Sequence, residues 1–453
     1  MKRNTQFVVL MAIWVAAGWI ASPLGLAVVP LSVLLLKQKH MYAELIIGFI
    51  FILILSDSRQ YQLAFAKDVK NFYILLLTAF YLFDRKQFTT KNSLIIPFIP
   101  FLIWSTAMLI NSPQLSLAIQ KTMSYALLFL VTPAFFYKAY QDKGPMFLRD
   151  FIYFVTLLLI IGLILIPVKY DFVYLAGRYN GILGNPNGLG IFATMFFILL
   201  SCTQIKFKEL FTKNELIFIY AILMVSIVLS GSRNTLMSII IFLAFTKFYK
   251  LSYWYGFMAV IGAAVLYQTV FTNLPTILEA LGLAKALRAD SIENGSGRMV
   301  AWMFAWQRLN TDVKLFIMGG GFAYDEYIFM INQKALNMLG HQGGVHNTYL
   351  ALWLNTGIIG LTLWVVGFLR TIFNAVKISF TAFPIMYAAL FSGTFEAWLM
   401  GSLNPYTIMF LFVLTLITTG NEKFKDHEHY SATADHPGET KQPLKEIEKV
   451  HAS

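Results

Sequence analysis

Four residues able to do acid–base or anion chemistry stand at or just before the start of apolar runs in this 453-residue chain. His346 precedes the run "NTYLALWLNTGIIGLTLW", Arg233 follows "SGS", Arg298 follows "ENGSG", and Arg178 lies in "GRYNGILGNPNGLG". A neutral imidazole accepts a proton near neutral pH, and a guanidinium binds phosphate through two parallel hydrogen bonds. The four residues therefore suit proton transfer beside a bound phosphate group.

The arginines are predicted at the starts of helices. Arg233 falls in the first turn after Ser232, where unpaired backbone N–H groups attract phosphate although the helix dipole disfavours a cation. Arg298 opens a helix in which Trp302 and Trp306 share one face, as in a helix lying against the membrane surface. Taken alone, such arginines also fit interfacial side chains reaching lipid headgroups. Together they predict a polyanion held at one membrane surface.

The glycine-rich stretch around Arg178 has two interpretations. Asn185 can cap the following helix, with Pro186 in its first position. The glycines permit close backbone approach, either to a ligand or to a neighbouring helix. The stretch lacks the lysine of a P-loop and the strand context of a nucleotide-binding loop, so by itself it is better explained as a structural turn.

The histidine begins the spacing His-Asn, nine residues, Gly-x-x-Gly, formed by His346, Asn347, Gly357 and Gly360. At 3.6 residues per turn His346 and both glycines share one helical face, and Gly357 would lie about 16 Å along the helix from His346. Small residues inside a bilayer let another helix approach closely. We therefore expect the glycines to dock a continuous helix and so fix His346 as a general base at its outer end; a polar interfacial residue or helix cap is the alternative.

Other polar residues are weaker candidates. His341 and His346 lack the acidic or cysteine neighbours expected of zinc, so we expect no metal and no other cofactor. Asp57 is a distant metal-ligand candidate. The single cysteine, Cys202, is expected to be a buried thiol. Carboxylates able to pair with the arginines or orient His346 are Asp290, Glu293, Asp312, Asp325 and Glu326.

These residues must be positioned by membrane helices. The chain is 58% hydrophobic and 13% charged, and its apolar runs of 14 to 20 residues are typical of an all-α polytopic integral membrane protein. Lys and Arg are dispersed between the runs, so the net charge of +12 indicates membrane topology and not nucleic-acid binding. We expect 12 to 14 transmembrane helices, near 7–20, 24–36, 42–56, 70–83, 94–111, 121–137, 150–167, 188–204, 215–231, 235–248, 254–270, 347–369, 379–398 and 405–419.

The positive-inside rule orients these spans, with the N-terminus retained in the cytoplasm. The loop near 57–70, which carries three cations, is the main exception to the alternation. The domain prediction is a membrane-embedded domain over 1–420, containing one long periplasmic loop at about 271–346, and a disordered cytoplasmic tail over 421–453. Residues 178, 233, 298 and 346 all fall on the outer side.

The motif "HNTYLALWLNTGIIG", with "GR…G…NPNGLG", "SGSRN" and "SGR…W" before it, resembles the bacterial O-antigen ligase and polymerase superfamily. The resemblance is strongest from Arg178 to Trp364, and the first 150 residues match only as helices. It implies a metal-independent, membrane-embedded C-type glycosyltransferase of the bacterial inner membrane. Its donor is an undecaprenyl-diphosphate-linked glycan, and its acceptor is lipid A-core for a ligase or another lipid-linked repeat for a polymerase.

The resemblance also assigns roles. His346 matches the base that deprotonates the acceptor hydroxyl, and Arg178, Arg233 and Arg298 match the arginines that hold the diphosphate on the periplasmic face. Catalysis at a sugar diphosphate needs charge stabilisation of the leaving group and one base, which agrees with these roles. The partners expected are the donor, the acceptor and membrane lipids.

Three alternatives remain open. The motif does not separate ligase from O-antigen or exopolysaccharide polymerase, and a protein-directed oligosaccharyltransferase belongs to the same set. A polysaccharide or lipid transporter would also have many helices and outer arginines. Such a protein usually carries broken helices and ionisable residues near the bilayer midplane, in two related halves.

Overall fold

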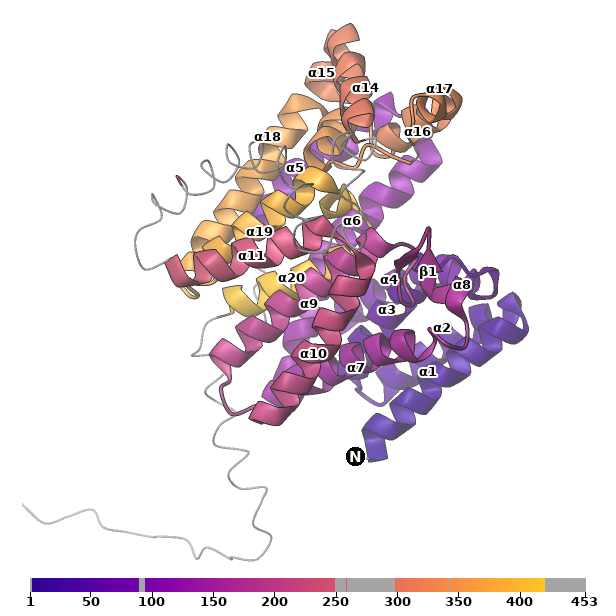
Figure 1. Ribbon diagram of the computed structural model, residues 1–453, viewed down its shortest axis with the longest axis vertical. Helices are drawn as coiled ribbons and strands as arrows, with labels where there is room; N and C mark the ends of the chain where they lie inside the picture. The colour runs from indigo at the N-terminus through magenta and orange to yellow at the C-terminus, as the bar shows by residue number, and fades with distance from the viewer. Residues whose placement is uncertain (1, 89–93, 249–257, 259–297, 342, 420–453) are drawn as a thin grey trace, which may run out of the picture. The chain divides into compact units, whose positions relative to one another are not determined.

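The computed structural model describes residues 2–88, 94–248, 258, 298–341 and 343–419 (Figure 1). The described residues up to Thr418 belong to one compact unit. The predicted span at 254–270, most of the loop predicted before residue 298, and the tail predicted to be disordered lie outside the described residues. Asp290 and Glu293 lie outside them as well.

The described chain is almost entirely helical, as predicted. Its strands are confined to a two-residue antiparallel hairpin, β1 (Tyr174–Leu175) and β2 (Arg178–Tyr179), with Leu175 opposite Arg178. The α-helices are α1 (Lys2–Ile20), α2 (Ser22–Gln38), α3 (Tyr42–Asp57), α4 (Phe65–Phe83), α5 (Ile99–Ala107), α6 (Leu115–Lys143), α7 (Pro145–Ile164), α8 (Tyr170–Val173), α9 (Pro186–Lys206), α10 (Lys213–Ser230), α11 (Arg233–Phe248), α14 (Arg298–Thr311), α15 (Val313–Met318), α16 (Tyr324–Ile331), α17 (Gln333–Met338), α18 (Thr348–Val376), α19 (Ala382–Phe395) and α20 (Pro405–Thr418).

Every predicted apolar run that falls within the described residues coincides with a helix. The run at 94–111 is divided into the 3-10 helices η3 (Ile96–Phe98) and η4 (Met108–Asn111) with α5 between them. Among the described helices, five are long and apolar enough to cross a membrane: α6, α7, α9, α10 and α18. The count of 12 to 14 spans and the periplasmic placement of the long loop stay predictions.

Helix α9 lies at the centre of the part of the bundle that contains the predicted site residues. It is apolar on all faces and packs against α10, α11 and α20 (Figure 1). A Cβ atom at Gly188 would lie 2.1 Å from Tyr406 Oη, and one at Gly190 would lie 2.1 Å from Thr235 Oγ1. These two glycines therefore let α20 and α11 close onto the first turns of α9.

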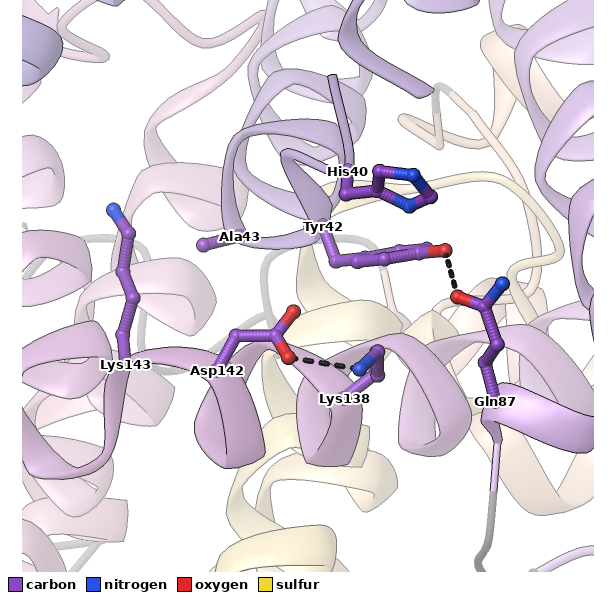
Figure 2. A pocket seen from close by; sticks show the side chains of 7 residues that line it. All are labelled: His40, Tyr42, Ala43, Gln87, Lys138, Asp142 and Lys143. Atoms are coloured by element: carbon purple, nitrogen blue, oxygen red, sulfur yellow. Dashed lines mark hydrogen bonds and ion pairs between the residues drawn. The ribbon is translucent and has the colours of Figure 1, made fainter. Parts of the chain in front are cut away.

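The ends of the helices separate two groups of polar residues. At one end a cavity of about 220 Å³ is formed by the α2–α3 loop, the segment after α4 and the end of α6, with Lys138 bonded to Asp142 and Tyr42 to Gln87, both at 2.8 Å (Figure 2). Lys143 Nζ pairs with Glu44 at 3.1 Å. The positive charges of Lys138 and Lys143 are thus balanced by carboxylates. The loops that meet here are three of those predicted to be cytoplasmic.

The second group of polar residues lies at the other end of the same helices. Asp57, at the far end of α3 from Tyr42, accepts hydrogen bonds from Gly184 N at 2.9 Å and Tyr406 Oη at 2.8 Å. Lys206, at the opposite end of α9 from this contact, donates to Leu416 O at 3.2 Å. We call the end of the bundle that contains Asp57, Gly184 and Tyr406 the site end.

Helix α18 differs from the prediction. The expectation of one continuous helix with His346 and both glycines on one face is wrong, because Gly357 has φ 68° and ψ 179° and breaks the helix. His346 lies before the N-cap Asn347, with a left-handed φ of 46°. A Cβ atom at Gly357 would lie 2.1 Å from Ile317 O of α15. The glycine thus accommodates a segment of the predicted loop and not another membrane helix.

Other parts of the protein donate hydrogen bonds to the backbone carbonyls next to the break in α18. Gly320 N donates to Leu354 O at 2.9 Å, and the indole of Trp104 donates to Thr356 O at 2.8 Å. These bonds satisfy carbonyl groups that lose their helical partners at Gly357. Gly360 keeps a packing role, since a Cβ atom there would lie 3.0 Å from the ring of Trp104.

Candidate active site

A carboxylate that the sequence analysis did not select, Glu396, lies at the centre of the polar network at the site end. Its Oε2 lies 3.0 Å from His346 Nδ1, and its Oε1 accepts hydrogen bonds from Arg298 Nη2 at 2.6 Å and Asn187 Nδ2 at 2.8 Å. Asn187 Oδ1 in turn accepts a bond from Arg178 Nη2 at 2.9 Å. Three of the four predicted site residues are therefore joined through one carboxylate.

The start of α18 holds His346 against Glu396. The side chain of Asn347 caps the helix by accepting bonds from the N–H groups of Tyr349 and Leu350 at 2.9 and 3.0 Å. Thr348 Oγ1 donates to the backbone carbonyl of Glu396 at 2.8 Å. The left-handed backbone of His346 is strained for a residue with a Cβ atom, and such strain gathers at functional sites. The role of Asn347 as a structural residue agrees with this geometry.

The charges fix the tautomer of His346. Glu396 accepts hydrogen bonds from Arg298 and Asn187 and lies within hydrogen-bond distance of His346, an environment that suits an ionised carboxylate. A carboxylate only accepts hydrogen bonds, so the hydrogen lies on His346 Nδ1. Nε2 then carries a lone pair. The side chain of His346 is 31% exposed. In the neutral ring, Nε2 is the nitrogen able to accept a proton.

Arg178 reaches the network from the β1–β2 hairpin. Its Nε donates to Ser230 O at 2.9 Å, which ties the hairpin to the end of α10. Asn185 caps α9 by accepting from Gly188 N at 2.7 Å, with Pro186 at the first position, and this confirms the predicted helix start. The cap presents Asn187 to both Arg178 and Glu396.

Arg298 lies in α14, whose described part begins at this residue, and its guanidinium lies 5.9 Å from the ring centre of Phe395. The predicted placement of this helix against the membrane surface stays a prediction, since Trp306 is 47% exposed. Trp302 packs on Phe395 at 6.0 Å, and Trp306 packs on Trp353 at 5.6 Å. Both indoles therefore hold α14 against α18 and the end of α19, which places Arg298 next to Glu396.

Arg233 is the first residue of α11, as predicted. The adjacent Asn234 donates through Nδ2 to Ser392 O at 3.3 Å, one helical turn before Glu396. The turn before α11 contains Ser230, whose carbonyl accepts from Arg178. The start of α11 therefore lies between Ser230, which accepts a hydrogen bond from Arg178, and Ser392, which precedes Glu396 by one helical turn.

The three described carboxylates among those predicted to orient His346 have other partners. Asp312 caps α15 by accepting from Leu315 N at 3.1 Å, and Glu326 pairs with Lys121. The backbone N–H of Asp325 donates to Asn355 Oδ1 at 3.0 Å, next to the break in α18. These three residues support the loop helices and not the histidine. Glu396 was missed because it lies inside an apolar run, although an ionisable residue in such a run is itself a functional signal.

His341 and Asp57 make structural contacts. His341 is 2% exposed, and its Nε2 lies 3.1 Å from Gly344 O. Among the described residues, no group of three or more His, Cys, Asp or Glu could hold a metal ion. Asp57, named as a distant ligand candidate, anchors the loop before α9 through Gly184 instead.

Comparison with known proteins agrees with the family suggested by the motif. Residues 218–365 match a family model described as O-antigen ligase. The matched segment contains Arg233, Arg298 and His346, while Arg178 and Glu396 lie outside it. No curated protein matches the chain. The match at residues 218–365 supports membership of the O-antigen ligase and polymerase family, whose activity is of the membrane glycosyltransferase type.

Proposed function

We propose that the protein transfers a glycan from an undecaprenyl diphosphate to a hydroxyl group of a glycan acceptor, on the periplasmic face of the bacterial inner membrane. The observation that carries this proposal is the hydrogen bond between His346 Nδ1 and Glu396, within a network that also holds Arg298 and Arg178. It combines one base with cations suited to phosphate, which is what transfer from a sugar diphosphate requires.

In the proposed reaction, His346 Nε2 removes the proton of the acceptor hydroxyl as its oxygen attacks the anomeric carbon of the donor sugar. The bond between that carbon and the diphosphate oxygen breaks, and the electron pair leaves with the diphosphate. The carboxylate of Glu396 stabilises the imidazolium formed at His346. The proton passes to solvent afterwards.

The proposed diphosphate clamp consists of Arg178, Arg233 and Arg298. A guanidinium has five N–H donors, so the bond from Arg298 to Glu396 is compatible with a second bond to phosphate. Arg178 and the start of α11 are held together through Ser230. Charge that develops on the leaving diphosphate would thus meet permanent cations without a metal ion.

We assign the acceptor as lipid A-core, which makes the protein an O-antigen ligase; a polymerase of O-antigen or exopolysaccharide is the alternative. Deletion of the gene followed by gel electrophoresis of lipopolysaccharide separates the two. A ligase predicts rough core with full-length chains left on the carrier lipid. Core carrying a single repeat would establish the polymerase instead.

One observation favours a transporter as a second candidate, because α18 is broken at Gly357. Against that function, the carbonyl groups at the break are bonded to Gly320 and Trp104 and do not line an ion site. Purified protein supplied with the lipid-linked donor and a glycan acceptor decides between the classes. A glycosyltransferase gives a lengthened acceptor and free polyprenyl diphosphate, whereas a transporter gives neither.

A further inference from the structure

Asn187, in the first turn of α9, joins two charged residues of the candidate site. Its Oδ1 accepts a hydrogen bond from Arg178 Nη2 at 2.9 Å, and its Nδ2 donates to Glu396 Oε1 at 2.8 Å. A guanidinium only donates and a carboxylate only accepts, so the two partners fix the orientation of the amide. Asn187 is thus held as a link between a cation and an anion.

The elements on the two sides of this link differ in how they are supported. A Cβ atom at Gly188 would lie 2.1 Å from Tyr406 Oη, so α20 packs directly on the first turn of α9. Arg178, by contrast, lies in a hairpin whose strands have two residues each. A side chain on a packed helix positions its partner more precisely than a side chain on a loop. Asn187 therefore connects the hairpin of Arg178 to a fixed helix.

The link is also uncharged. Arg178 donates through Nη2 to Asn187 and through Nε to Ser230 O at 2.9 Å, and both acceptors are neutral oxygen atoms. These two bonds therefore orient the guanidinium without cancelling its charge. The variant Asn187→Asp would instead form an ion pair with Arg178 and set a second carboxylate beside Glu396, where like charges repel each other.

We propose that Asn187 is a positioning residue for donor binding: it holds the guanidinium of Arg178 in place and, being uncharged, leaves the positive charge to the diphosphate. This inference rests on the proposed role of Arg178 in the diphosphate clamp. Loss of Asn187 leaves the contacts of Glu396 with His346 and Arg298 in place. We therefore expect donor binding to depend on Asn187 more than the base does.

Position 187 allows a variant that separates charge from shape. Asn187→Asp keeps the size of the side chain, and a carboxylate in the first turn of a helix is favoured by the helix dipole. If Asn187 only stabilised the start of α9, Asn187→Asp would be a milder change than Asn187→Ala, whereas the proposal predicts the opposite order for donor binding. Asn185→Asp is the matched control. It adds the same charge at an exposed position of the same helix start, and Asp can still accept the cap bond from Gly188 N.

The test measures equilibrium binding of undecaprenyl diphosphate by the purified full chain in lipid nanodiscs. We expect Asn187→Ala to weaken binding about three- to tenfold through loss of one hydrogen bond to Arg178, and Asn187→Asp to weaken it about tenfold beyond that. Asn185→Asp should bind within about twofold of wild type, since its charge is exposed and screened. Binding by Asn187→Asp as tight as by Asn187→Ala would overturn the inference, and so would equal losses in Asn187→Asp and Asn185→Asp.

Arg178→Ala, measured alone and combined with Asn187→Ala, separates this inference from the proposed function. If Asn187 acts through Arg178, then Asn187→Ala should weaken binding by less than about twofold in the Arg178→Ala protein. Unchanged binding in Arg178→Ala would refute the clamp and this inference with it. Impaired binding in Arg178→Ala, with fully additive losses in the double variant, would refute the role of Asn187 alone.

Discussion

At the scale of single residues, one carboxylate organises the site. Glu396 binds His346 through one oxygen and Arg298 and Asn187 through the other. In the proposed reaction it sets the tautomer of the histidine and would stabilise the positive charge that the histidine gains on accepting a proton. Arg298 in turn pairs with the other oxygen of this carboxylate.

Replacing Glu396 by Gln tests this arrangement. Gln keeps the size of the side chain but loses the charge, and its amide can donate to Nδ1, which would place the hydrogen on Nε2. We expect kcat to fall by about 10²-fold or more, while donor KM changes little. Glu326→Gln, which removes an exposed carboxylate paired with Lys121, is the control and should keep wild-type kcat. Near-normal turnover in Glu396→Gln would refute the orienting role.

A second residue-scale prediction concerns pH and stability. Burial, with the charge of Glu326 adding to it, raises the pKa of Asp325 to about 6. A carboxyl whose pKa is higher in the folded state contributes stability below its unfolded pKa, and that stability is lost as pH rises through about 6. Asp325→Asn should therefore raise Tm relative to wild type at pH 7.5 more than at pH 4.5. A Tm difference independent of pH would contradict the raised pKa.

The sequence predicted a helix beginning at Arg233, because N-cap residues and apolar periodicity are local signals. It did not predict the partner of the histidine. Glu396 is 50 residues further along the chain and approaches His346 only because α18 and α19 pack together. Local spacing carries no information about which of several carboxylates a fold brings near.

At the scale of elements, the break in α18 determines how the loop helices join the bundle. Gly357 accepts the end of α15 at a distance that no side chain permits, and Asn355 holds the start of α16 through Asp325 N. The glycine spacing predicted that another segment packs closely against this helix, which is correct. The prediction also assumed a helical φ at every residue, which is wrong at Gly357. A left-handed φ at a glycine cannot be deduced from helical periodicity, and neither can the identity of the docked segment.

Gly357→Ala should be strongly destabilising. The added methyl group would meet Ile317 O at 2.1 Å, and the backbone at φ 68° is itself costly for alanine. We expect a loss of about 2–4 kcal/mol of unfolding free energy, and reduced transfer activity. Gly177→Ala is the control, since Gly177 has a φ of 73° and open space, and it should cost only about 1 kcal/mol. Thermal unfolding in detergent compares them, and equal losses would argue against the contact with α15.

At the scale of the whole molecule, lysine-rich loops and the candidate site lie at opposite ends of shared helices. The helices α3 and α9 each connect the two ends. The cations near 57–70 are the main exception to the charge pattern expected from the positive-inside rule. Two of them donate hydrogen bonds to backbone carbonyls at the site end. Arg59 donates to Tyr174 O at 3.0 Å and Lys70 to Leu403 O at 3.2 Å. The exceptional loop therefore has a structural explanation.

Cysteine labelling tests the orientation of the two ends. The native Cys202 is buried, so single cysteines can be introduced at exposed positions against a silent background. Tyr61 is 81% exposed at the site end, and Arg85 is exposed at the lysine-rich end. A maleimide that does not cross the inner membrane should label Tyr61→Cys in intact spheroplasts and Arg85→Cys only after lysis. The reverse pattern would invert the predicted topology.

The helical architecture was predictable because long apolar runs leave few alternatives for the backbone in a membrane. Each described run became a helix, and the start of α9 at Pro186 followed from its cap. The site required contacts between α9, α14, α18 and the end of α19, and these depend on packing across the whole bundle. The motif selected His346 and the arginines, but it did not predict the contacts that join them through Glu396.

The central claim is that His346 is the base for glycan transfer. The most direct measurement is single-turnover transfer by purified His346→Ala in nanodiscs, together with binding of the lipid-linked donor. We predict donor affinity within about twofold of wild type and a transfer rate lower by about 10²–10⁴-fold, the usual contribution of a general base. Transfer by His346→Ala within a few-fold of the wild-type rate would contradict the account.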